Sequence, residues 1–158
     1  MIPKLIVANW KMAVDLDAVR VFECDWNDCP AVTTADVVVA PPAIFLHHAA
    51  GLLGTSLCGQ DVSIHLPGAH TGEVSAAMLK ALGCRYGIVG HSERRSGHNE
   101  TNAVIARKAS RLEAEGLRPI ICVGESLLER QSGGAESVIA AQVTESCRGL
   151  NTVPIIAY

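Results

Sequence analysis

Polar side chains that could bind an anion and assist a proton transfer follow several predicted strands of this sequence. They are Asn9 and Lys11 after the first apolar run, His91 and Glu93 after the fourth, and Glu125 after the fifth. In parallel α/β folds, ligand-binding groups collect at the carboxyl ends of the strands. Lys11 would supply a compact positive charge, and a helix that starts near His91 would supply backbone donors. Together these residues predict a site for an anionic substrate.

Each of these residues also has an ordinary structural explanation. Lys11 can be a solvated loop lysine, and His91 can cap a helix or accept a hydrogen bond. Glu125 and Ser126 can cap the helix that follows them. The functional interpretation therefore depends on all of these residues meeting at one place.

Short apolar runs alternate with helix-period stretches along the chain, which predicts repeated βα units around a parallel sheet. The predicted strands cover residues 5–8, 37–40, 56–60, 86–89, 119–123 and 153–158. Five helices are predicted. The first begins near Asp15, the second covers 43–53, and the third follows the N-cap Ser75 as far as Gly83. The fourth ends at Gly116, and the fifth runs from Gly133-Gly134 to about Cys147. We expect an α/β fold with six parallel strands and about five helices.

Apolar residues three or four positions apart predict the buried faces of three helices. The residues are Met78 with Leu82, Ile105 with Ala109 and Leu112, and Ile139 with Val143. Between the third predicted strand and the Ser75 helix lies a segment of 14 residues, Asp61 to Val74, that is rich in polar and turn residues. Such a segment is longer than most βα connections, and its length suggests a functional loop.

Size and composition exclude several classes of function. With 158 residues and 49% hydrophobic content, the chain is long enough for one core, and we expect a single domain over 1–158. The net charge of -3 and the scattered basic residues do not suit a nucleic-acid surface. No apolar run approaches the roughly 18 residues of a membrane span, and the apolar stretch after Lys4 is too short for a signal peptide. We expect a soluble cytoplasmic protein with neither a nucleic-acid nor a membrane partner.

The cysteines and histidines do not form a recognisable metal motif. The six cysteines are Cys24, Cys29, Cys58, Cys84, Cys122 and Cys147. They lie in strand and helix patterns, and no pair has the C-x-x-C spacing of a zinc site. We therefore expect reduced, mostly buried thiols and no bound metal.

Four segments resemble the signature segments of the triosephosphate isomerase family, and they occur in the family order. They are Asn9-Trp10-Lys11-Met12, Gly68 to Ser75, Gly90 to Arg95, and Cys122 to Glu125. The final Ile156-Ala157-Tyr158 is similar to the run that precedes the family's catalytic Glu-Pro-Val-Trp segment. The resemblance covers nearly the whole chain and implies part of a (β/α)8 barrel.

The resemblance also implies an activity and roles for particular residues. The activity is the interconversion of dihydroxyacetone phosphate and glyceraldehyde 3-phosphate, in glycolysis and gluconeogenesis, without a cofactor. Asn9 and Lys11 would bind substrate, with Lys11 facing the phosphate and the developing enediolate charge. His91 would be the neutral electrophile, an assignment for which this family is the established example. Glu93 would be a buried partner of Lys11.

The family comparison further implies a homodimer. Thr71, at the tip of the long loop that also carries Glu73, would insert into a neighbouring subunit and steady its Asn9 and Lys11. Cys122 would occupy a family position beside the site. The sequence departs from the family pattern at His70, where an aromatic residue is usual, at Ala13, where Asn is common, and in the short stretch from Ala135 to Thr152.

The largest departure is that residues 1–158 contain no equivalent of the family's general-base Glu, its closing loop or its two glycine-rich phosphate turns. A complete barrel needs eight strands and about 250 residues. We therefore expect a truncated homologue with little or no isomerase activity as an isolated chain. Its unpaired edge strands favour a homo-oligomer, most simply a dimer. The alternatives are an active isomerase completed by a rearranged oligomer or a second polypeptide, and a non-catalytic oligomer that binds a triose phosphate or another small phosphate anion.

Overall fold

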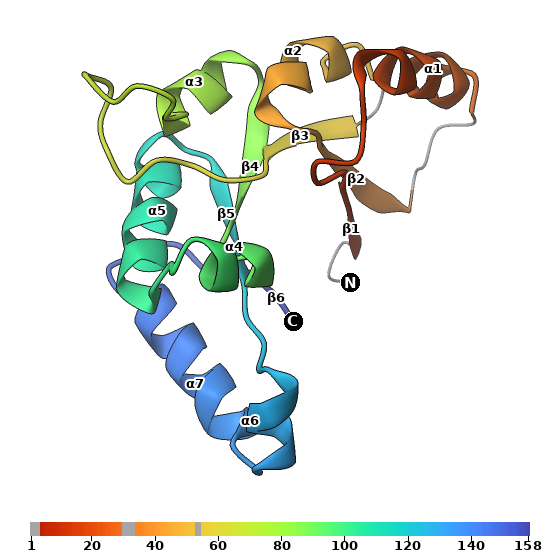
Figure 1. Ribbon diagram of the computed structural model, residues 1–158. Coiled ribbons are helices and arrows are strands. Elements are labelled where there is room, and N and C mark those ends of the chain that lie inside the picture. The colour runs from red at the N-terminus through yellow and green to blue at the C-terminus, as the bar shows by residue number, and fades with distance from the viewer. Residues whose placement is uncertain (1–3, 30–33, 53–54) are drawn as a thin grey trace.

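The computed structural model describes residues 4–29, 34–52 and 55–158, which form a curled sheet of parallel strands with helices along its outer side (Figure 1). The strands are β1 (Lys4–Asn9), β2 (Ala35–Ala40), β3 (Thr55–Gly59), β4 (Cys84–Val89), β5 (Arg118–Cys122) and β6 (Ile155–Ala157). They lie in the sheet in chain order, and every neighbouring pair is parallel. The expected partial barrel of six parallel strands is confirmed.

Two strands form the edges of this sheet. Strand β1 pairs with β2 from Lys4↔Ala35 to Asn9↔Ala40, and β6 pairs with β5 from Ile120↔Ile155 to Cys122↔Ala157. In the described part of the chain, β1 and β6 each have one partner strand. The sheet is therefore open between β1 and β6.

The described residues contain more helices than the expected five. They are α1 (Leu16–Asn27), the 3₁₀ helix η1 (Ala43–Phe45), α2 (Leu46–Ala49), α3 (Ala76–Ala81), α4 (Ser92–Gly97), α5 (Asn102–Ala114), α6 (Leu127–Gln131) and α7 (Ala135–Ser146). Helices α4 and α6 are not among the five predicted, because one or two turns are too short to show an apolar period, although helix starts near His91 and at Glu125-Ser126 are expected from their caps. The helix predicted over 43–53 is split into η1 and α2, and its last residue, Leu53, lies outside the described residues.

Side-chain caps fix where several helices begin. Asp15, Ser75 and Thr101 accept backbone hydrogen bonds at the starts of α1, α3 and α5. Such caps satisfy amide groups that have no partner within the helix. The N-caps predicted at Asp15 and Ser75 are confirmed.

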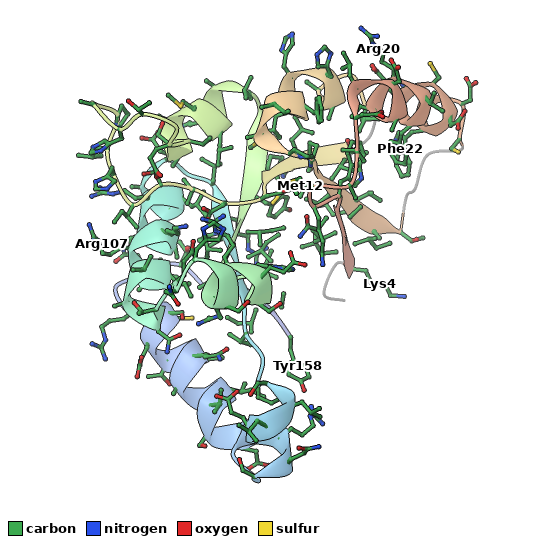
Figure 2. The ribbon with its side chains drawn as sticks, in the orientation of Figure 1. Lys4, Met12, Arg20, Phe22, Arg107 and Tyr158 are labelled. Atoms are coloured by element: carbon green, nitrogen blue, oxygen red, sulfur yellow. The ribbon has the colours of Figure 1, made fainter. Side chains whose placement is uncertain are left out.

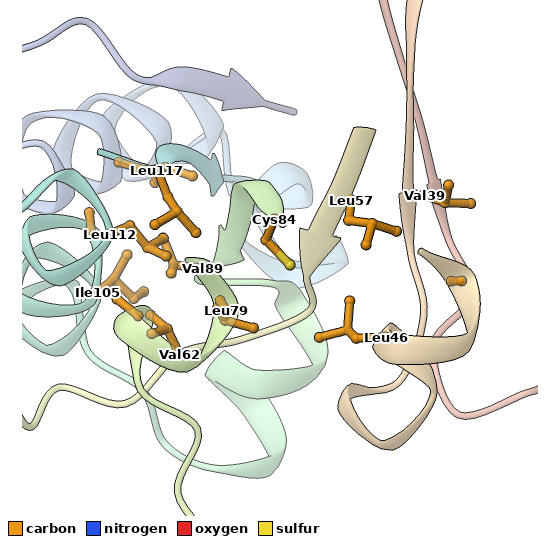
Figure 3. Packing of buried hydrophobic residues seen from close by; sticks show 14 of the residues in the cluster. Val39, Leu46, Leu57, Val62, Leu79, Cys84, Val89, Ile105, Leu112 and Leu117 are labelled. Carbon is orange, nitrogen blue, oxygen red and sulfur yellow. The ribbon is translucent and has the colours of Figure 1, made fainter. Parts of the chain in front are cut away.

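Buried residues lie on both faces of the sheet. The larger cluster fills the space between the sheet and the helices (Figure 3), and a smaller one, with Tyr86 and Ile88, lines the concave face. The buried face predicted for α5 is confirmed, because Ile105, Ala109 and Leu112 are fully buried.

The predicted buried face of α3 is wrong at Met78, although Leu82 packs against the core, and Gly59 explains why Leu79 is buried instead. Met78 is 54% exposed, while Leu79 is buried against β3. A Cβ atom on Gly59 would lie 2.6 Å from Leu79 Cδ1. Glycine at this position therefore lets α3 approach the sheet closely, and the face of α3 is set by this approach.

The structure gives all six cysteines as free thiols, as expected. Cys58 and Cys84 are buried, whereas Cys24 and Cys29 are exposed. The expectation of mostly buried thiols is therefore wrong for these two, because Cys24 lies on an exposed face of α1 and Cys29 lies beyond the end of that helix. No helix in the described ranges has the length and apolar character needed to cross a membrane.

Candidate functional site

A cavity of about 510 Å³ lies at the carboxyl ends of β1 to β4. Asn9, Lys11, His91 and Glu93 all line it, although 82 positions separate Lys11 from Glu93. The cavity has the size of a small-molecule site. The structure thus brings together four of the five residues for which the sequence predicts chemistry.

The backbone of Lys11 is held in an unusual conformation at the edge of this cavity. Its φ angle is 52°, in the left-handed region that residues other than glycine rarely adopt. Asn9 Oδ1 accepts a hydrogen bond from the Lys11 amide at 2.9 Å, and Gln60 Nε2 donates to the Lys11 carbonyl at 2.9 Å. Gln60 Nε2 also donates to the Ala40 carbonyl at 2.8 Å. These contacts tie the loop after β1 to the ends of β2 and β3.

Gln60 is a positioning residue that the sequence prediction missed. The predicted third strand included it, whereas β3 ends at Gly59 and leaves Gln60 as the first residue after the strand. A polar residue directly after a strand is the same signal that identified Asn9 and Lys11.

Lys11 forms an ion pair with Glu93, with Nζ 2.7 Å from Oε1. The predicted pairing is confirmed, but the predicted burial is wrong, because the Lys11 and Glu93 side chains are 51% and 61% exposed. Glu93 lies in the first turn of α4, which faces solvent at the cavity mouth. The hydrogen bond from Lys11 holds the pKa of Glu93 below its ordinary value, and the charge of Lys11 acts in the same direction.

His91 is the N-cap of α4, so its capping explanation is confirmed. Its Nδ1 accepts from the Glu93 amide at 3.3 Å and also lies 3.4 Å from Glu93 Oε2. One nitrogen cannot accept from an amide and donate to a carboxylate in the same tautomer. We assign Nδ1 as the acceptor, because the amide is fixed by the helix and the exposed carboxylate is not. Nε2 then carries the proton and can donate to a ligand.

Glu125 lies at a second, neighbouring cavity of about 510 Å³ at the carboxyl ends of β4 to β6. His91 lines both cavities. Met12 from the first cavity and Tyr158 from the second appear on opposite sides of α4 in Figure 2. The polar residues predicted to meet at one place therefore form two groups that share His91.

The Glu125 side chain is only 3% exposed. It forms an ion pair with Arg130, and Tyr158 Oη donates to its Oε1 at 3.2 Å. A hydrogen bond from its own backbone and the pairing with Arg130 lower the pKa of this carboxyl group. Glu125 does not cap α6. That role belongs to Ser126, which forms a reciprocal capping box with Glu129.

A buried ion-pair network beside the first cavity was not predicted. Lys108 Nζ lies 2.6 Å from Asp61 Oδ1 and 2.7 Å from Glu100 Oε1, and Arg94 contacts the same two carboxylates at 2.8 and 2.6 Å. The Lys108 and Glu100 side chains are 8% and 6% exposed. Lys108 lies three residues after Ile105 and four before Leu112, and so on the predicted buried face of its helix. A lysine at such a position could have indicated a buried ion pair.

The long loop from Asp61 to Val74 has no regular secondary structure, as expected. Ser63 donates to the Val74 carbonyl at 2.8 Å, which closes the base of the loop. The rings of His65 and His70 stack with centroids 3.9 Å apart. Thr71 and Glu73 are exposed. Thr71 does not line the first cavity of its own chain, whereas Glu73 does.

Cys122 lies beside the second cavity, and burial raises the pKa of its thiol. Its carbonyl accepts from Arg95 at 3.0 Å. Within the described ranges, His, Cys, Asp and Glu residues form no group of three or more that could hold a metal ion.

Comparison with known proteins identifies a family. A family model described as triosephosphate isomerase matches residues 4–158. Relatives named triosephosphate isomerase include those of Delftia acidovorans (49% identical over 144 residues, 89% of this chain and 58% of the relative) and Herpetosiphon aurantiacus (45% over 162 residues, 98% and 65%). A third, from Thermus thermophilus, is 44% identical over 149 residues, covering 92% of this chain and 60% of the relative. The chain thus spans less than two thirds of these relatives' length.

Proposed function

The chain belongs to the triosephosphate isomerase family, and we propose that its first cavity binds a triose phosphate for the interconversion of dihydroxyacetone phosphate and glyceraldehyde 3-phosphate. One observation carries this proposal: Asn9, Lys11, His91 and Glu93 line a single cavity of about 510 Å³. These residues supply a cation and a neutral hydrogen-bond donor at the carboxyl ends of parallel strands. Such a combination suits a phosphorylated carbonyl compound.

Each residue has a separate role in this proposal. Lys11 attracts the phosphate and the negative charge that develops on the enediolate, and Asn9 holds the Lys11 loop. His91 Nε2–H donates to the carbonyl oxygen and stabilises charge as the proton leaves carbon. Glu93 accepts a hydrogen bond from Lys11 Nζ at 2.7 Å, which holds the Lys11 side chain at the cavity. This division leaves the abstraction of the carbon-bound proton to another group.

We further propose that residues 1–158 alone have little or no isomerase activity. Three carboxylates line the first cavity in the described part of the chain, namely Asp61, Glu73 and Glu93. Asp61 is held by Lys108 and Arg94, Glu93 is paired with Lys11, and Glu73 lies on the exposed loop. A positioned general base typically contributes about 10²- to 10⁴-fold to such a step. Without one, the site can bind and polarise substrate but cannot turn it over efficiently.

A coupled assay of the purified 158-residue polypeptide tests this proposal. We expect turnover indistinguishable from the blank, together with saturable binding of a phosphorylated substrate analogue. Turnover well above the blank that disappears in the His91→Ala variant would contradict the lack of activity. It would favour the alternative in which a rearranged oligomer or second polypeptide supplies the base.

Absence of analogue binding would contradict the proposed site itself. Binding without turnover is also what a non-catalytic anion-binding protein would show. An isomerase site and a simple anion-binding site differ in what they require of the analogue. Only the isomerase site should need an oxygen that, like the substrate carbonyl, accepts a hydrogen bond from His91. Equal affinities for an analogue with this oxygen and for inorganic phosphate would favour simple anion binding.

For the partner, we propose a homodimer in the cytoplasm. Apolar side chains are exposed on or beside both edge strands, including Ile6 (53%), Ile156 (41%) and Val153 (82%). Unpaired strand edges with apolar side chains favour association. The exposed Thr71 adds a loop contact near the partner's Lys11. Light scattering should give twice the chain mass, and a compact, folded monomer at micromolar concentration would contradict the dimer.

A further inference from the structure

A groove on the outer surface, far in sequence from Lys11, has the chemistry of a separate anion site. It lies between α5 and α7, has a volume of about 580 Å³, and is lined by Ala103, Ala106, Arg107, Ser110, Arg111, Glu145 and Arg148. We call it the α5–α7 groove. None of these residues lines the first or second cavity. It is therefore independent of the proposed isomerase site.

Three guanidinium groups surround the α5–α7 groove in a protein whose net charge is -3. Arg107 and Arg111 lie one turn apart on α5, and Arg148 follows α7. Arg107 extends from the outer side of α5 in Figure 2. The single carboxylate, Glu145, already accepts a hydrogen bond from Asn102 Nδ2 at 2.9 Å. The groove thus carries an excess of positive charge.

Two of these arginines have no protein partner in the described part of the chain. Neither Arg107 nor Arg148 forms an ion pair or a side-chain hydrogen bond there. Arg111 is different, because its Nε donates to the Ile64 carbonyl at 2.9 Å. This bond orients one guanidinium group and leaves its terminal nitrogens available. The donors of the groove are therefore partly preorganised and largely unused.

The groove is held open by contacts near both ends of α5. At the first residue of α5, Asn102 contacts Glu145 and Ser146 of α7. At its penultimate residue, Glu113 accepts hydrogen bonds from Asn151 and Thr152, which follow α7. These contacts hold α5 against the C-terminal end of α7 and against the segment that follows it. A ligand would therefore meet a groove whose backbone is already in place, with Arg107 and Arg148 free to turn toward it.

We propose that the α5–α7 groove binds a small organic phosphate. A tetrahedral phosphate offers oxygens in several directions, so three arginines can share it, and guanidinium groups bind such oxygens bidentately. The Ser110 hydroxyl can add a further donor. Ala103 and Ala106 supply an apolar floor for the organic part, and the volume lies within the range of small-molecule sites.

Titration of the 158-residue protein with ADP at low salt tests the proposal, with inorganic phosphate and adenosine as separate probes. We expect saturable ADP binding, weaker binding of phosphate, and little binding of adenosine. Backbone amide NMR signals of Ala103, Ala106 and Ser110 should shift with ADP. Because a lost charge-assisted hydrogen bond weakens binding by about tenfold or more, the variant R107A/R148A should lower ADP affinity at least that much.

Two further variants separate this site from the others. R20A/R118A removes the same charge elsewhere on the surface. Measured at about 0.15 M salt, where distant exposed charges are screened, it should leave ADP affinity within about twofold of the wild type, whereas R107A/R148A should still weaken it. Lys11→Met removes the main cation of the first cavity and should also leave ADP affinity unchanged. Binding that survives in R107A/R148A but is lost in Lys11→Met would overturn the proposal, as would no detectable binding of ADP.

Discussion

Two lysine–carboxylate pairs near the candidate site have the same contact distance and different surroundings. Lys11 lies 2.7 Å from Glu93 at the mouth of the first cavity, with both side chains more than half exposed. Lys108 lies 2.7 Å from Glu100 behind the cavity wall, with both side chains less than a tenth exposed. Distance therefore does not distinguish the two pairs, whereas burial does.

The difference in burial implies a difference in role. Water screens the exposed pair, so it contributes little to stability, and a bound anion can compete for Lys11. The buried pair has lost its hydration, and each charge depends on its neighbours in the Asp61–Arg94–Glu100–Lys108 network. A lysine–carboxylate pair thus serves ligand binding at Lys11 and stabilises the cavity wall at Lys108.

The largest expected effect is that of Lys108→Met. The substitution leaves Asp61 and Glu100 with Arg94 as their remaining cation. Removing one partner of a buried ion pair typically lowers the free energy of unfolding by about 3–5 kcal/mol. Urea denaturation followed by circular dichroism measures this loss.

Lys80→Met is the matched control for this substitution. The Lys80 side chain is 60% exposed, and its Nζ lies 3.9 Å from Glu115 Oε2, so its removal should have almost no effect on the free energy of unfolding. Similar urea midpoints for the two variants would show that the buried and the exposed ion pair contribute equally to stability, which would contradict the comparison.

The next effect is the acid dependence that Glu100 gives to the buried network. Burial acts to raise the pKa of Glu100, but hydrogen bonds and charges from Lys108 and Arg94 outweigh it and lower the pKa. A carboxyl group whose pKa is lower in the folded state binds protons more weakly there than in the unfolded chain. Its contribution to stability is complete above the unfolded-state pKa of about 4.3 and is lost as the pH falls through the folded-state value.

Urea midpoints measured from neutral pH into the acid range test this linkage. We expect Glu100→Gln to be less stable than the wild type at neutral pH. The gap should narrow as the pH falls below the unfolded-state pKa, because the unfolded wild-type chain then binds a proton at Glu100 that the folded protein does not yet bind, which lowers the wild-type free energy of unfolding. The other carboxyl groups are present in both proteins, so the difference reports Glu100 and its coupling to Asp61, whose pKa is raised by burial and by the Glu100 charge. A gap that stays constant with pH would show that Glu100 contributes to packing and not through its charge.

Lys11→Met should separate ligand binding from stability. We expect a urea midpoint close to that of the wild type, because exposed ion pairs contribute little to the free energy of unfolding. Affinity for a phosphorylated substrate analogue should fall by about tenfold or more, since a charge-assisted hydrogen bond is lost. A clear loss of stability with unchanged affinity would reverse the roles of the two lysines.

The smallest expected effect is that of Glu93→Gln. The amide oxygen can still accept from Lys11 Nζ, but the negative charge beside the anion site is removed. We expect affinity for the analogue to rise about two- to fivefold at low salt and to converge with the wild type at high salt. Weaker binding would show that the Glu93 charge is needed to orient Lys11. Gln60→Ala, which releases the Lys11 carbonyl instead, gives a useful comparison.

Much of the fold could be predicted because short apolar runs and cap residues act locally. The strands alternate with helices in a way that only a parallel sheet accommodates, and Asp15 and Ser75 begin their helices as predicted. Helices α4 and α6 could not be predicted from apolar spacing, since six and five residues do not complete an apolar period. The orientation of α3 depends on the space beside Gly59, a contact between segments 20 residues apart.

The sequence by itself determined the family, the parallel architecture and the four residues at the first cavity, because these depend on local patterns and on motifs that occur in order. The tertiary structure decided how those residues are used. It placed Glu93 in solvent and Glu100 in the interior, although both follow β4 closely. It also separated Glu125 from Lys11, and it assembled two arginines of α5 and one that follows α7 into a groove. Burial and long-range contact depend on the whole packed chain, which is why no local pattern could supply them.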